Sequence, residues 1–159
     1  MRMKIGSLWI ANDEGLIPDY LSFKKQDGDF TMSRDDIDDV IRRTDGVRFD
    51  CLIEHRDKIY TLVDHLYLYN WLMVDITDRR KYKKLTNDCD DFTMILYGHL
   101  REWDTRLATC IVWGYNPDGE YHSVVGYVNT RREFRLIEPQ NDIISMDIKE
   151  WDVKKIFFI

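Results

Sequence analysis

The periodicity of the apolar residues changes near residue 104, and this change limits the folds that the chain can adopt. In residues 89–103, apolar side chains recur at the spacing of a helix with one buried face, formed by Phe92, Ile95, Leu96, Leu100 and Trp103. Residues 107–115, 121–129 and 133–138 instead alternate apolar and polar side chains, with short turns between them. We therefore predict an α+β domain in which a helix packs on an antiparallel sheet.

The first third of the sequence predicts shorter elements. Residues 4–10 and 20–32 alternate in the same way and indicate a strand pair. Ser33 is typical of a helix N-terminal cap, and the helix that follows should stop near Gly46. Residues 47–53 then predict a strand that places Cys51 on one face with its apolar neighbours, Val47, Phe49 and Ile53. Cys51 should therefore be buried and unreactive.

Two further segments complete the prediction. Residues 58–78 show helical spacing, and residues 78–84 form a basic connector that should be a solvated loop. The residues around Trp151 predict one or two final strands. With 159 residues and no linker or repeat, we expect a single domain over residues 1–159.

Composition excludes several classes of function. The net charge of −6, with both signs interspersed, argues against a nucleic-acid partner. No window has the roughly 18 apolar residues of a membrane span, and the start lacks a signal-peptide pattern, so we expect a cytoplasmic protein. Three cysteines, an odd number, favour a reducing compartment over a disulfide framework.

Cys89 is the residue most suited to chemistry. It stands at the predicted N-terminus of the 89–103 helix, where free N–H groups and the helix dipole stabilise a thiolate. His122 lies in the second predicted strand and Glu138 ends the third, so a hairpin could bring imidazole and carboxylate together. Asp142 is the alternative acid, because a small error in register moves the choice along the chain. The remaining histidines, His55, His65 and His99, are set aside.

Short motifs around these residues resemble a known superfamily. Residues 87–92 (NDCDDF) and 121–125 (YHSVV) resemble the cysteine helix and histidine strand of the bacterial transglutaminase-like cysteine proteinases, within the papain-like superfamily. Residues 137–140 (IEPQ) are similar to the C-terminal papain-like domain of the Marasmius agglutinin type of lectin. The resemblance covers roughly residues 58–159 and implies a papain-like fold, whereas residues 1–57 match nothing that we can name.

The resemblance implies a site and a function. It implies a Cys89, His122 and Glu138 triad in a papain-like thiol hydrolase of the cysteine peptidase type, acting on a peptide or protein substrate through a thioester. Asn87 is the nearest candidate for completing an oxyanion hole. Calcium dependence is implied too, with Asp90, Asp91 and Gln140 as the matching ligands, although the two acids could simply satisfy the helix N-terminus.

Two other functions stay open at this point. A transglutaminase-like acyl transferase would use the same attack by Cys89 and would differ only in whether water or an amine resolves the intermediate. The alternative of a different class is a non-catalytic papain-fold interaction or assembly module, for example a phage or other viral accessory protein.

Overall fold

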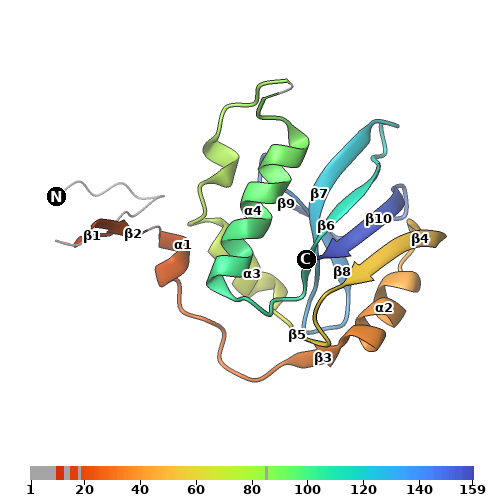
Figure 1. Ribbon diagram of the computed structural model, residues 1–159, viewed down its shortest axis with the longest axis horizontal. Helices are drawn as coiled ribbons and strands as arrows, with labels where there is room; N and C mark the ends of the chain where they lie inside the picture. The colour runs from red at the N-terminus through yellow and green to blue at the C-terminus, as the bar shows by residue number, and fades with distance from the viewer. Residues whose placement is uncertain (1–9, 13–14, 18, 85) are drawn as a thin grey trace.

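In the computed structural model, a six-stranded sheet lies between two layers of other elements (Figure 1). The structure describes residues 10–12, 15–17, 19–84 and 86–159, and side chains from Tyr20 onward. The predicted strand over residues 4–10 therefore lies almost wholly outside the described residues. In chain order the elements are β1 (Ile10–Asn12), β2 (Gly15–Ile17), α1 (Asp19–Ser22), β3 (Thr31–Ser33), α2 (Arg34–Arg42), β4 (Val47–His55), β5 (Ile59–Thr61), α3 (His65–Leu72), η1 (Thr77–Arg79), α4 (Cys89–Trp103), β6 (Thr109–Tyr115), β7 (Tyr121–Val128), β8 (Phe134–Glu138), β9 (Ile143–Ser145) and β10 (Asp152–Phe158).

The main sheet has the strand order β4-β10-β6-β7-β8-β9. Strands β6 to β9 form a meander of antiparallel neighbours, as the alternation after residue 104 predicts. At the other side β10 pairs antiparallel with β6 but parallel with β4. The predicted all-antiparallel sheet is therefore wrong, because β4 and β10 lie far apart in the sequence and no local pattern encodes the direction of their pairing.

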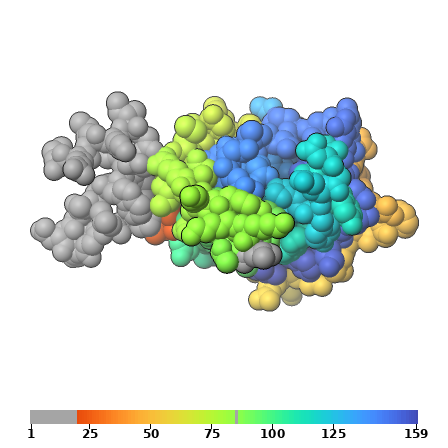
Figure 2. All heavy atoms as spheres, turned by 90° about the horizontal axis from the view of Figure 1, so that it is seen from above, coloured from red at the N-terminus to blue at the C-terminus, as the bar shows by residue number. Residues whose placement is uncertain are grey.

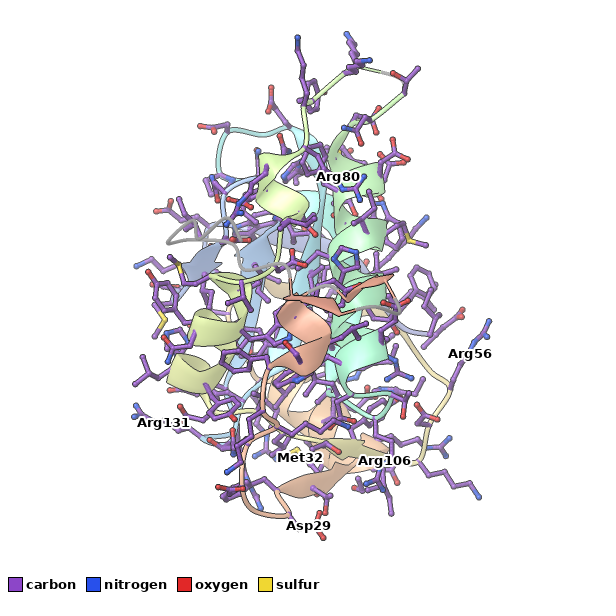
Figure 3. The ribbon with its side chains drawn as sticks, turned by 90° about the vertical axis from the view of Figure 1, so that its left-hand side faces the viewer. Asp29, Met32, Arg56, Arg80, Arg106 and Arg131 are labelled. Carbon is purple, nitrogen blue, oxygen red and sulfur yellow. The ribbon has the colours of Figure 1, made fainter. Side chains whose placement is uncertain are left out.

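Helices α3 and α4 cover one face of this sheet. Strand residues on this face are Ile111, Val125, Tyr127 and Ile137, and they share a buried cluster with the helices. Leu96 and Leu100 of α4 are fully buried in it, as the helical stripe predicts, and Trp71 of α3 donates from its indole N–H to the Tyr20 carbonyl oxygen of α1 at 3.1 Å. Figure 3 shows α1 lying in front of α3 and α4, between them.

The other face carries α2 and the β3–β5 pair. Ile37 and Ile41 of α2 are fully buried against alternate strand residues, among them Val112 and Val124. Helix α2 begins where predicted, since the Ser33 hydroxyl accepts a hydrogen bond from the Asp36 N–H at 3.2 Å. Neighbouring residues of one strand thus reach opposite cores, which is the consequence of the two-residue period.

Three segment predictions need correction. Residues 20–32 hold the end of α1, a connector and the start of β3 instead of a strand pair. Residues 58–78 are helical only over α3 and η1, because residues 59–61 pair with β3. Cys51 is buried as predicted, but Phe49 is 89% exposed, since β4 is the edge strand of the sheet and extends past the layer that covers it. Helix α4 matches the prediction of residues 89–103 at both ends.

Among the described residues, no helix has the length and apolar character that crossing a membrane would require.

Candidate functional site

Helix α4 begins at the same end of the molecule as the β6–β7 turn, and this meeting point holds the predicted site (Figure 1). Figure 2 looks onto that end and shows the green surface of α4 beside the cyan surface of β6 and β7. Strand pairing places His122 opposite Gly114 and Ser123 opposite Trp113. Residues from the middle and the last third of the chain therefore share one surface.

Cys89 is the first residue of α4 and is half-buried. The turn before it is fixed by a capping box, in which the Asp91 carboxylate accepts a hydrogen bond from the Asp88 N–H at 3.1 Å. The Thr93 hydroxyl donates to the Cys89 carbonyl oxygen at 2.8 Å. These local contacts hold the Cys89 backbone in place at the start of the helix.

The Cys89 thiol has a raised pKa, which differs from the sequence-based expectation. Burial is the largest cause, and the neighbouring Asp90 and Asp88 carboxylates add to it. A hydrogen bond that the sulfur accepts from the Ser123 N–H acts in the opposite direction. This direction is opposite to the expected stabilisation of a thiolate by the helix N-terminus, because burial disfavours the charged form of the thiol and the Asp90 and Asp88 carboxylates disfavour a further negative charge beside them.

His122 and Glu138 form a short hydrogen bond, with 2.6 Å between Nε2 and Oε2. Their side chains are 17% and 24% exposed. The pairing of β7 with β8 brings Val125 opposite Ile137. His122 is three residues from Val125 and Glu138 is one residue from Ile137, so alternation along the strands places both side chains on the same face of the sheet. The second carboxylate oxygen of Glu138 accepts a hydrogen bond from the Gln140 N–H at 3.3 Å.

Of the two candidate acids, Glu138 is the one that contacts His122. Glu138 bonds to His122, whereas Asp142 lies in the β8–β9 turn and lines a groove with residues of α3. Because Nε2 bonds to Glu138 and His122 makes no other hydrogen bond to the described residues, Nδ1 is the ring nitrogen left for a ligand or a thiol. The catalytic roles of Cys89, His122 and Glu138 stay predictions.

Two neighbours of the site were not predicted from the sequence. The ring of Trp151 lies 6.3 Å from the His122 ring, centroid to centroid, at an angle of 35°. Ser123 contributes its backbone N–H to the Cys89 sulfur. A backbone donor leaves no residue-type signal, and Trp151 comes from a tail whose place beside β7 depends on the whole sheet.

Asn87, the predicted oxyanion residue, has its side chain turned into the preceding loop. Its amide donates to the Lys81 carbonyl oxygen at 2.5 Å, and its backbone forms a two-way bridge with Lys83. That donor is thus already used at the base of the loop, which Figure 3 shows leading away from the labelled Arg80.

The three predicted calcium ligands serve other contacts. Asp91 belongs to the capping box, Asp90 lies 3.8 Å from the Cys89 sulfur through Oδ1, and Gln140 donates its N–H to Glu138. Within the described ranges, no group of three or more His, Cys, Asp or Glu side chains is gathered as a metal site requires. Calcium binding by Asp90, Asp91 and Gln140 stays a prediction.

The other histidines have structural partners. His55 bonds to Asp38 at 2.8 Å and stacks on Phe158, while His65 bonds to the Tyr127 hydroxyl at 2.8 Å. His99 bonds to the buried carboxylate of Asp75 at 2.6 Å and stacks on the ring of Tyr20. These contacts tie separate elements of the fold together.

Comparison with known proteins identifies the fold. No protein-family model and no curated protein sequence matches this chain. Two similar solved structures are of a lectin: a PSL1a complex with E64, with a TM-score of 0.73 and 16% identity, and Polyporus squamosus lectin bound to the epitope Neu5Aca2-6Galb1-4GlcNAc, with a TM-score of 0.70 and 15% identity. Each covers 81% of this chain, which spans 51% and 50% of the two lectin chains.

These findings correct the resemblance drawn from short motifs. The similar structures are named as lectin chains and not as cysteine peptidases, and no peptidase family matches. The prediction of a papain-like α+β fold is therefore contradicted. The prediction of a papain-like thiol hydrolase, that is, a thiol protease, is contradicted as well. The fold is instead that of the lectin chains, with a six-stranded mixed sheet and few helices.

Proposed function

We propose that Cys89, His122 and Glu138 form a nucleophilic thiol site that transfers an acyl group from a donor to an acceptor. The observation that carries the proposal is the 2.6 Å hydrogen bond between Glu138 and His122. Ser123, the residue that follows His122, donates its backbone N–H to the sulfur of the half-buried Cys89. The proposal concerns group transfer by these side chains and not the peptide hydrolysis that the motifs suggested.

Each side chain has a defined part in the step. The Cys89 sulfur attacks the carbonyl carbon of the donor, and Nδ1 of His122 takes the thiol proton as the carbon–sulfur bond forms. The leaving group departs with that proton, and an acceptor amine then breaks the thioester and returns a proton to the sulfur. Glu138 holds the ring through Nε2 and stabilises its charged form.

The raised pKa of Cys89 determines how this site must work. A thiol whose pKa is raised by burial and by Asp88 and Asp90 is not ionised beforehand. The sulfur therefore becomes nucleophilic only as His122 removes its proton during attack, so His122 is needed for the reaction and not merely for fine adjustment.

An acetyl-transfer assay tests the proposal. p-Nitrophenyl acetate is the donor and glycine ethyl ester the acceptor, and mass spectrometry locates the acetyl group. We expect one acetyl group on Cys89, its loss in Cys89→Ala, and a rate at least about a hundredfold lower in His122→Ala, since a general base typically contributes about 10²–10⁴-fold. Cys51→Ala is the matched control, because Cys51 is buried. Equal rates in wild type and Cys89→Ala would refute the proposal.

Carbohydrate binding is a second candidate function. It is supported by the likeness to a lectin chain bound to a sialylated epitope, although that likeness shows only the fold and covers about half of the lectin. The surface that suits it here is the exposed ring pair of Tyr115 and Tyr121, whose centroids are 5.3 Å apart at the end of β6 and β7. Lys154 places its ammonium group 5.9 Å from the Tyr115 ring centre.

Titration with that trisaccharide, followed by tryptophan fluorescence and calorimetry, separates this candidate from the first. If the ring pair binds sugar, Tyr121→Ala should weaken binding at least about tenfold, a loss of about 1.4 kcal/mol. The exposed Tyr82, in the basic loop, provides the control Tyr82→Ala. No heat and no fluorescence change at millimolar sugar would contradict a carbohydrate role for this chain.

A further inference from the structure

We propose that the groove between α3 and the edge strand β9 binds an extended polypeptide segment of a partner protein that carries lysine or arginine between apolar side chains. This surface lies apart from Cys89 and plays no part in the function proposed above. It is a cavity of about 430 Å³ lined by His65, Tyr69, Met73, Asp78, Asn141, Asp142, Ile143, Ile144 and Met146. Figure 3 shows its two walls on the same side of the molecule, with β9 above α3.

The walls of the groove expose large apolar side chains. Met73 is 55% exposed, Ile143 59% and Met146 53%, and Tyr69 is exposed beside them. Leu66 continues the line along α3, since positions 66, 69 and 73 lie on one side of a helix. Apolar surface gathered in this way from two elements is typical of an interaction site, whereas single exposed residues need no explanation.

Strand β9 can pair with an added strand. It is the last strand of the sheet order and, among the residues that the structure describes, pairs with β8 alone. The outer edge of such a strand carries backbone N–H and C=O groups that an extended peptide can bond, while the side chains of that peptide reach pockets on either side. The groove and the strand edge together therefore suit a polypeptide better than a compact ligand.

The charge of the groove selects the partner. Asp78 and Asp142 both line it, and each has one buried carboxylate oxygen without a hydrogen-bond partner. The Arg79 guanidinium is 3.9 Å from this Asp78 oxygen. Of the other titratable residues of the wall, His65 is bonded to Tyr127 and Tyr69 is an exposed phenol. A lysine or arginine of the partner would supply the donors that these two oxygens lack.

Burial and the neighbouring carboxylates of Asp78 and Asp75 raise the pKa of Asp142 to about 7, against a weaker opposite effect of Arg79. A cationic side chain bound beside Asp142 favours its charged form and is itself favoured by it. Binding should therefore tighten as the pH rises through neutrality.

Peptide binding tests the inference. The probes are fluorescein-labelled eight-residue peptides in which valine alternates with lysine, with glutamate or with serine, and fluorescence anisotropy gives the affinity. We expect the lysine peptide alone to bind, with affinity at least about tenfold lower for Asp142→Asn and for Met73→Lys, which corresponds to about 1.4 kcal/mol or more. Met94→Lys is the matched control, since Met94 is equally exposed but lies on α4 outside the groove.

Two further binding measurements determine which kind of ligand occupies the groove. A lysine peptide methylated on alternate backbone nitrogens should lose binding if the peptide adds a strand to β9. Free lysine methyl ester should compete only weakly. Equal binding to Met73→Lys and wild type, equal binding of the methylated peptide, complete competition by lysine methyl ester, or no binding of the lysine peptide would each overturn the inference. Circular dichroism of every variant verifies that it is folded.

Discussion

Asp142 holds a carboxylate where the fold disfavours its charge. The residue has φ +59°, in the left-handed region that Asp and Asn tolerate best, and its pKa is raised to about 7 from an ordinary 3.8. A carboxyl group whose pKa is raised on folding contributes stability that is present below its unfolded pKa and is lost as the pH rises through the folded value. For Asp142 that loss falls between about pH 4 and about pH 7.

Asp142→Asn should therefore stabilise the protein above neutral pH. Asparagine keeps the shape and the left-handed preference but carries no charge, and each pKa unit of difference is worth about 1.4 kcal/mol before solvent screening. After a discount for partial exposure we expect a gain of about 1–2 kcal/mol at pH 8 that vanishes near pH 4. Urea unfolding across this range measures it, with Asp118→Asn in the exposed β6–β7 turn as the control. A gain that did not vary with pH would contradict the assignment.

At the scale of elements, Gly46 joins α2 to β4 at a point where no side chain fits. Its φ is +92°, and a Cβ atom there would stand 1.9 Å from the Ile148 carbonyl oxygen. Gly119, in the β6–β7 turn, has φ +80° but nothing within 4 Å of the same position. Substitutions at Gly119 and Gly46 therefore separate two contributions to the free energy of unfolding. Gly119 reports backbone strain alone, whereas Gly46 reports backbone strain together with a steric clash.

We expect Gly119→Ala to lower the free energy of unfolding by about 1 kcal/mol, for left-handed backbone alone. Gly46→Ala should cost about 3 kcal/mol or more, since the backbone of Ile148 must also move. Urea unfolding of both variants measures the difference. Similar costs for the two would show that Ile148 moves aside freely and that the α2–β4 turn is loosely held.

Helices and strands whose contacts lie close together in the sequence could be predicted from it, whereas strand pairs that depend on distant residues could not. Helix α4 has its cap and its apolar stripe within one segment, and the β7–β8 hairpin brings His122 beside Glu138 through short-range register. The parallel β4–β10 pair joins segments that lie far apart in the sequence, and it was not predicted. The position of Trp151 beside His122 could not be predicted either, because it also depends on the pairing of distant strands. The pKa of Cys89 depends on burial, which the position of the residue in its helix does not reveal.

At the scale of the whole molecule, the sheet gathers separate surfaces on one fold. Cys89 contacts β7 through the Ser123 N–H, one residue after His122, whereas the groove is lined by residues of α3 and of the β8–β9 hairpin. Glu138 and Asp142 are the two ends of that hairpin's turn, and the Asp142 N–H donates to the Glu138 carbonyl oxygen at 2.9 Å.

The dependence of the Cys89 alkylation rate on pH tests the central claim most directly. Iodoacetamide is added to wild type and His122→Ala from about pH 6 to about pH 10, on either side of an ordinary thiol pKa of about 8.5, and mass spectrometry follows Cys89 separately from the buried Cys51 and Cys110. The pKa of the Cys89 thiol is raised in the wild type. At neutral pH we therefore predict faster alkylation of the wild type, in which His122 can take the thiol proton, than of His122→Ala, and we expect the two rates to converge in the alkaline range, where the thiol ionises without a base. Identical profiles for the two proteins would show that His122 does not act on the thiol and would contradict the proposed site.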